Sequence, residues 1–108
     1  MSNDKRHRID IYGNVKVKNE LGETSYKFQK ITSMWAAIIP QTGSLQKQQA
    51  DTILTNVTHK IVVRYNVGKD ISKNMRIYYR NHRFDIKYIL NPYYANEDLE
   101  IFCQELID

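Results

Sequence analysis

The chain has 108 residues, of which 42% are hydrophobic and 26% are charged, and its formal net charge is +4. A domain of this length buries about 60% or more of its unfolded surface, so we expect one self-supporting core and exclude disordered and fibrous classes. No apolar stretch is long enough to span a membrane, so no membrane partner is expected. The positive charge permits contact with nucleic acid, but it is spread along the chain and forms no stripe.

The N-terminal third of the chain carries strand patterns. Residues 1–7 are polar and are expected to form a flexible tail, and residues 8–107 are expected to form a single domain. From Arg8, Ile9 and Ile11 alternate with polar residues, which is typical of a half-buried strand. A turn is predicted at residues 19–24, and the alternation then resumes.

Apolar runs and further alternation predict the remaining strands. The run MWAAIIP is apolar on both faces and ends at Pro40, which cannot donate to a sheet, so we expect a central strand that leaves its sheet there. The run THKIVVRY alternates, a hairpin is predicted around Asn81 and His82, and a last strand includes Cys103. Together these strands predict an all-β fold, a small antiparallel barrel or sandwich. The residues expected in its core include Trp35, Ile61, Val63, Ile77, Phe84, Ile86 and Ile101.

Residues 41–57 interrupt this pattern as an inserted long loop between two central strands. They are rich in glutamine and threonine. Ala50, Ile53, Leu54 and Val57 recur at helical spacing, so a short amphipathic helix is an alternative to an irregular loop. The segment would then be an ordinary surface loop or a helix packed on the barrel.

The sequence offers little for catalysis or cofactor binding. The three histidines share no metal-ligand spacing with one another or with Cys103, the only cysteine. Cys103 falls on the apolar face of its strand, where cysteine behaves as a small hydrophobe, and a lone cysteine suits a reducing cytoplasm. The four glycines are too far apart to form a phosphate-binding loop. We therefore expect no enzyme activity, no metal and no cofactor.

A nucleic-acid-binding barrel similar to an OB fold is a competing hypothesis. Tyr65, Tyr79 and Tyr88 could stack bases beside arginines of the same strands. However, the alternation places these tyrosines on the same faces as aliphatic residues such as Val63 and Ile77, which favours packing in the core.

Several short motifs occur in a recognisable order. MWAAIIP is followed by a glycine, a polar segment, THKIVVRY and RIYYRNHRFDI. From about Ile9 to Glu105, this order resembles the head-tail joining, or head-closure, adaptor family of tailed bacteriophages. The residues that fit positions of that family are Trp35, Ala36, Pro40, Gly43, Thr58, His59, Arg64, Tyr65, Arg76, Ile77, Phe84, Ile86 and Asn91.

The resemblance implies a noncatalytic virion protein with a small β-barrel body. Copies of such a protein assemble in the virion neck as a ring, on the order of a dozen subunits, below the portal and its adaptor. The ring retains packaged double-stranded DNA and offers a surface to the tail-completion protein. Synthesis in the cytoplasm of a bacterial host, from a phage or a prophage, is expected. A tail-terminator or tail-completion ring is the alternative within this class.

The resemblance also assigns residues 41–57 to the central channel, as a stopper or an intersubunit loop. Ordering these residues costs about 1–2 kcal/mol each in backbone entropy, so pairing with neighbours after assembly would be needed to hold them in place. Lys47 and Asp51 cancel in charge, so DNA contact would release few counterions. The residues expected to act here are Gln41, Gly43, Ser44, Leu45, Lys47, Gln48, Gln49, Asp51, Ile53, Leu54 and Val57.

Overall fold

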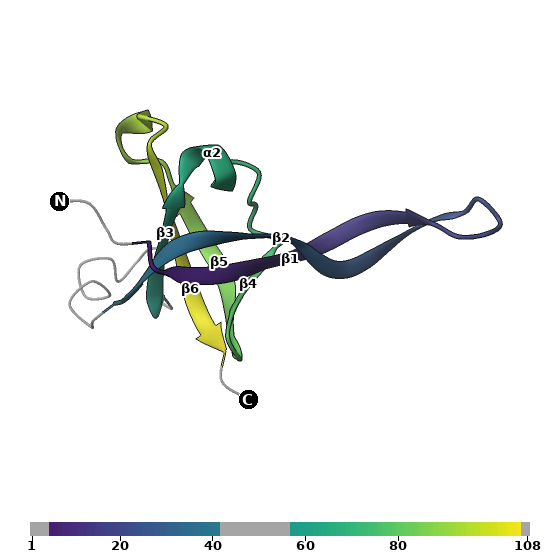
Figure 1. Cartoon of the computed structure of the whole chain (residues 1–108), viewed down its shortest axis with the longest axis horizontal. Helices are drawn as coiled ribbons and strands as arrows, with labels where there is room; N and C mark the ends of the chain where they lie inside the picture. Colours follow the sequence, from purple (N-terminus) through teal and green to yellow (C-terminus); the bar gives the residue numbers. More distant parts are fainter. Residues whose placement is uncertain (1–4, 42–56, 107–108) are drawn as a thin grey trace.

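The computed structural model describes residues 5–41 and 57–106, and its body is a closed antiparallel β-barrel with the strand order β1-β2-β3-β6-β5-β4 (Figure 1). The elements are β1 (His7–Lys18), β2 (Thr24–Pro40), β3 (His59–Arg64), α2 (Tyr65–Gly68), β4 (Arg76–Tyr79), β5 (His82–Leu90), η2 (Pro92–Tyr94) and β6 (Asp98–Leu106). Pairing between β1 and β4 closes the sheet, so the barrel itself exposes no long strand edge. The prediction of an all-β barrel is confirmed.

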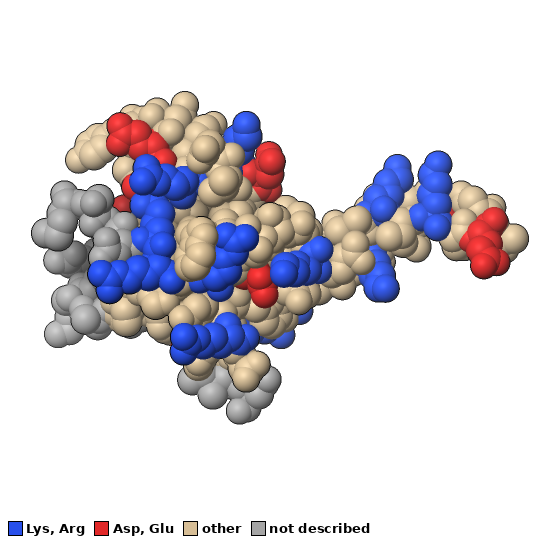
Figure 2. Space-filling model, in the orientation of Figure 1, with Lys and Arg blue, Asp and Glu red and all other residues tan. Residues whose placement is uncertain are grey.

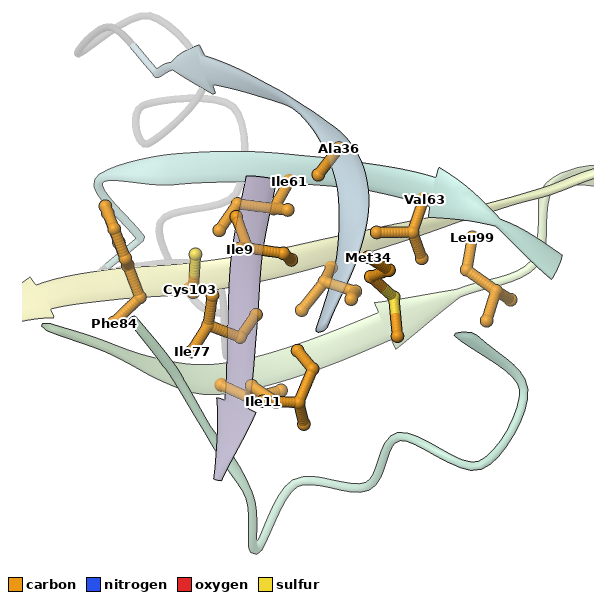
Figure 3. Packing of buried hydrophobic residues seen from close by; sticks show 12 residues of the cluster. Ile9, Ile11, Met34, Ala36, Ile61, Val63, Ile77, Phe84, Leu99 and Cys103 are labelled. Carbon is orange, nitrogen blue, oxygen red and sulfur yellow. The ribbon is translucent and has the colours of Figure 1, made fainter. Parts of the chain in front are cut away.

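Inward-facing aliphatic side chains fill the barrel (Figure 3). Ile9, Ile61, Ile77 and Ile101 are fully buried, and burial of each contributes about 1.5–3 kcal/mol relative to exposure. The predicted core residues that are buried are Ile61, Val63, Ile77, Phe84, Ile86 and Ile101.

The prediction that Trp35 lies in the core is wrong, because the residue is 53% exposed. Met34 and Ala36 point inward, so the period of two along β2 places Trp35 on the outer face. The guanidinium of Arg8, its partner on β1, lies 5.4 Å from the centre of the indole ring. The apolar run therefore has an outward face that the pattern of residue types did not indicate.

β1 and β2 continue past the barrel as a two-stranded hairpin, which we call the arm and define as residues 14–30 (Figure 1). The register of the β1–β2 pair shifts between Ile11 and Tyr12, shortly before the arm leaves the body. Among the described residues, no third strand pairs with this part of either strand. The arm gives the molecule its long axis, with overall dimensions of 53 × 29 × 26 Å.

A second irregularity changes the facing of β5. The register between β5 and β6 shifts between Ile86 and Tyr88, and this bulge inverts the alternation that follows it. Ile86 is buried and Ile89 packs against the core, whereas Tyr88 faces outward. The expectation that Tyr88 shares a face with the aliphatic core residues is thus wrong.

The fold also extends nearer to the N-terminus than predicted. β1 begins at His7, and the ammonium of Lys5 lies 3.3 Å from the carboxylate of Asp98 on β6. Residues 5–7, expected in a flexible tail, therefore belong to the folded body, while residues 1–4 lie outside the described part. Within residues 5–41 and 57–106, no helix has the length and apolar character needed to cross a membrane.

Candidate functional site: the barrel mouth, the arm and the groove

The end of the barrel where β2 finishes and β3 begins is called the mouth here. The backbone N–H of Gln41 donates to the carbonyl of Thr58 at 2.9 Å, just beyond the pairing of Pro40 with His59. The N–H of Thr58 in turn donates to the carbonyl of Cys103 on β6 at 2.9 Å. The chain therefore leaves the mouth after Gln41 and returns to it before Thr58, through adjacent antiparallel strands.

Two of the predicted stopper residues lie in the described part of the chain. Gln41 is half-buried and belongs to the mouth through its backbone hydrogen bond. Val57 is fully buried in the single chain, although the segment was expected to be held in place only by neighbours after assembly. The ladder between β3 and β6 continues one residue beyond the strand, to Thr58, which follows Val57 directly. The other residues lie outside the described part: Gly43, Ser44, Leu45, Lys47, Gln48, Gln49, Asp51, Ile53 and Leu54.

A polar cluster holds the mouth together. The hydroxyl of Thr58 accepts a hydrogen bond from the N–H of Glu105 at 2.7 Å and lies 2.9 Å from Nδ1 of His59. Burial lowers the pKa of His59, against the opposing effect of Glu105, and so favours the neutral imidazole, whose Nδ1 can accept from that hydroxyl. The His59 ring also meets the edge of Phe84 at 5.1 Å. The arrangement fixes the start of β3.

The cysteine near the mouth is not activated as a nucleophile. Cys103 is buried, and desolvation raises the pKa of its thiol to about 12, so the nucleophilic thiolate is not formed near neutral pH. His82 contacts Glu105 at 2.6 Å in a more exposed pair. Within residues 5–41 and 57–106, no group of three or more metal-ligating side chains comes together.

The free end of the arm is a tight turn with a defined shape. The side-chain carbonyl of Asn19 accepts hydrogen bonds from the N–H groups of Leu21 and Glu23, both at 2.9 Å. Gly22 has φ +81°, which suits glycine in the left-handed region. This turn leaves Leu21 82% exposed, with Glu20 beside it. Figure 2 shows acidic atoms at this tip and basic atoms along the shaft of the arm.

Aromatic and ionic contacts brace the base of the arm. The guanidinium of Arg76 on β4 lies 4.7 Å from the ring centre of Phe28, and Tyr12 stacks on the same ring at 6.1 Å. The ammonium of Lys30 lies 3.3 Å from the carboxylate of Asp10. The arm is therefore anchored to the body in a fixed direction at its base.

A groove of about 980 Å³ lies on the body at the opposite end of the β1–β2 ladder. Trp35 and Val67, both about half exposed, provide apolar surface there. The sequence did not reveal this groove, because α2 and the turn before β6 that form its rim are far apart along the chain. Its lining residues are Lys5, Arg8, Ser33, Met34, Trp35, Arg64, Asn66, Val67, Asn96, Glu97 and Asp98.

The tyrosines considered for base stacking do not form a common platform. Tyr65 and Tyr79 pack against the core, and the hydroxyl of Tyr79 lies 2.9 Å from Nδ1 of His7. Tyr88 is separated from them on the outer face by the bulge in β5. The most exposed aromatics are instead Tyr93 and Tyr94, in the turn before β6.

The barrel, the arm and the mouth can now be compared with known proteins. A family model described as phage head completion protein matches residues 2–106. The chain belongs to this family. It is therefore a structural protein of phage-type particles, as the resemblance implied.

Solved structures share the fold of this family member. The solution structure of protein SF1141 from Shigella flexneri 2a is 23% identical, with a TM-score of 0.72, and the match covers 93% of this chain and 91% of that chain. A chain in the virion of a native gene transfer agent particle is 16% identical, with a TM-score of 0.62 and coverage of 99% and 100%. At these identities the likeness shows the fold alone. No curated protein matches the chain significantly.

Proposed function

We propose that the chain is a neck protein that joins head to tail and closes the DNA exit channel after packaging. In this proposal its copies form a ring below the portal and adaptor, and they contact the tail-completion protein on the other side. Family membership supports a head-completion role, and the fold shared with a chain of a gene transfer agent virion agrees with it. The observation that carries the channel assignment is the mouth, where both ends of the segment from residue 42 to residue 56 are fixed side by side.

The closed barrel is consistent with a ring in which residues 42–56 reach the channel. A barrel without long free edges cannot assemble by adding strands to its sheet, so contacts between copies would use its side-chain surfaces or the parts that project from it. The arm projects from the barrel, and residues 42–56 belong to the longest stretch of sequence between consecutive strands, from Pro40 to His59. Ring symmetry would bring identical copies of that segment together around one axis, which is what a stopper requires.

The composition of the segment suits passage of DNA. Lys47 and Asp51 are its only charged residues, and they cancel. Contact with the phosphate backbone would therefore release few counterions and hold DNA weakly, so the same segment could block the channel and later let DNA slide.

Replacing residues 42–56 with a short Gly-Ser linker tests this function. The hydrogen bond between Gln41 and Thr58 brackets the deletion, so the variant should keep the barrel fold by circular dichroism. Particles assembled with it should lose packaged DNA, measured as the nuclease-sensitive fraction. A variant that neutralises only Lys47 and Asp51 is the matched control and should retain DNA. Full particles with the shortened segment would contradict the stopper role.

The alternatives give different results in the same preparation. A tail-terminator or tail-completion ring would copurify with isolated tails and not with DNA-filled heads. A nucleic-acid-binding barrel would bind short single strands at physiological salt, which the burial of Tyr65 and Tyr79 argues against.

A further inference from the structure

The tip of the arm is an ordered turn with an exposed apolar side chain, which suits insertion into a groove. Its turn is fixed by the two hydrogen bonds that Asn19 accepts and by one from Gly22 N–H to the Asn19 carbonyl at 3.0 Å. Leu21 projects from this turn with 82% of its surface exposed, between the exposed carboxylates of Glu20 and Glu23. Because the turn is already ordered, little conformational entropy would be lost when the tip binds.

The groove has the complementary features. Trp35 and Val67 expose apolar surface in it, and Arg8 is held over the indole ring and donates to the hydroxyl of Ser33 at 3.2 Å. Arg64 forms no ion pair with an acidic side chain of the described residues.

The net charge of the groove favours binding of an acidic protein segment. Lys5 and Asp98, also in the lining, neutralise each other at 3.3 Å. Glu97 is the remaining acid against two arginines, so the lining has a net charge of +1. The groove therefore pairs apolar surface with surplus positive charge.

The tip and the groove of one chain cannot meet. They lie at opposite ends of the same ladder, since Arg8 pairs with Trp35 at one end and Lys18 pairs with Thr24 at the other. Ten residues of strand separate these pairs, about 33 Å at the usual rise. The long dimension of 53 Å, against 29 and 26 Å across, means that the arm reaches roughly one barrel width beyond the body. A barrel placed beside the first one would lie within its reach.

We propose that the tip of the arm docks in the groove of a second copy of this chain. Leu21 would pack against Trp35 and Val67, and Glu20 and Glu23 would face the two arginines of the groove. Such a contact joins two different surfaces, so each copy can insert its own arm into one neighbour and bind the arm of another. The series of copies closes into a ring if the rotation from each copy to the next is a whole fraction of a turn. The proposal deepens the proposed function by naming a contact between neighbours in the ring.

Charge distinguishes this partner from DNA. The two carboxylates at the tip would repel phosphate, whereas the lysines of the arm lie along the shaft (Figure 2). A tip that entered a nucleic-acid groove would be expected to carry cations at its end. The tip therefore suits a basic protein surface better than a duplex.

Disulfide trapping between two full-length single-cysteine variants tests the contact. Leu21→Cys and Val67→Cys are mixed at high concentration under mild oxidation, and Asn81→Cys, in the exposed turn between β4 and β5, replaces Val67→Cys as the control. The native Cys103 is buried and does not compete. Circular dichroism first establishes that each variant is folded. The Leu21–Val67 mixture should form dimers at least about tenfold faster than the control mixture, because contact raises the local thiol concentration.

Three outcomes would overturn the proposal. The first is a trapping rate no higher than that of the control mixture. The second is rapid dimerisation of Leu21→Cys alone, which would indicate symmetric contact between arms. The third is protection of Leu21→Cys from maleimide by duplex DNA, which would assign the tip to nucleic acid. None of these outcomes depends on assembled particles, whereas the test of the stopper function does. The trapping experiment can therefore contradict the arm contact without contradicting the stopper function, and the particle experiment can contradict the stopper function without contradicting the arm contact.

Discussion

The strands β1 and β2 run through both the barrel and the arm, yet they are stabilised differently in the two regions. In the barrel, β1 and β2 each have a further neighbour, and alternate side chains such as Ile9 and Met34 are buried. In the arm the same ladder continues without a third strand, and Tyr26 and Leu21 are exposed. Isolated two-stranded hairpins are only marginally stable in water. The barrel therefore provides stability, and the arm is free to provide a surface.

Truncating a core side chain should have the largest effect and should separate the two regions. Ile77→Ala removes a fully buried side chain from the barrel and should lower the free energy of unfolding by about 2–5 kcal/mol. Tyr26→Ala, on the arm, removes a larger side chain that is mostly exposed, and should change it by no more than about 0.5 kcal/mol. Urea denaturation of both variants measures the difference. Equal losses would mean that the arm contributes to the folding core.

The glycines of the two regions should respond differently to an added methyl group. A Cβ on Gly68 in α2 would lie 2.5 Å from Cγ2 of Val63, a buried and β-branched neighbour that cannot easily move, so Gly68→Ala should lower the free energy of unfolding by about 1–3 kcal/mol. Gly22→Ala meets open space and should cost about 1 kcal/mol, because its φ of +81° is strained for alanine. Thermal unfolding of the two variants tests this order. A larger loss for Gly22→Ala would reverse the comparison.

The same contrast explains what the sequence could and could not predict. Inward alternation identified most of the core, because a strand in a closed barrel must bury one face. The alternation of Val15 and Val17, and of Tyr26 and Phe28, looks the same in the arm. Periodicity reports that one face is more apolar, but it does not report whether a third strand or solvent lies against it. The arm was therefore predicted as ordinary strand.

Single-residue irregularities account for the other errors. The bulge after Ile86 reverses the facing of Tyr88, and an extra residue of this kind has no clear signature in residue types. Trp35 was assigned to the core because its neighbours are apolar, although the side chains of this run that face the core are those of Met34, Ala36 and Ile38. The groove depends on the closure of the barrel, which brings distant segments together, so local patterns could not predict it.

Acidification should lower the stability of the barrel, and the arm should not affect how much stability is lost. The pKa of His59 is lowered in the folded state, so the unfolded chain binds a proton more readily, and stability that is present above about pH 6.5 is lost as the pH falls through the folded-state pKa. His59→Gln should therefore show a smaller fall in Tm between about pH 7.5 and pH 5.5 than the natural chain. A chain with a shortened arm should show the same fall as the natural chain. An unchanged fall in His59→Gln would remove His59 as a cause.

Shortening the arm should have the smallest effect on stability and the most selective effect on assembly. Residues 17–25 can be replaced by an Asn-Gly turn, because Lys16 and Tyr26 face each other across the ladder and a two-residue loop joins such a pair. The free energy of unfolding should change by no more than about 0.5 kcal/mol, since the removed residues bury little apolar surface. Self-association, measured by sedimentation at high concentration, should fall, and the single substitution Leu21→Ser should reproduce that fall without shortening the arm. If both variants associate as the natural chain does, the surface between copies lies elsewhere on the barrel, and the exposure of Leu21 has another cause.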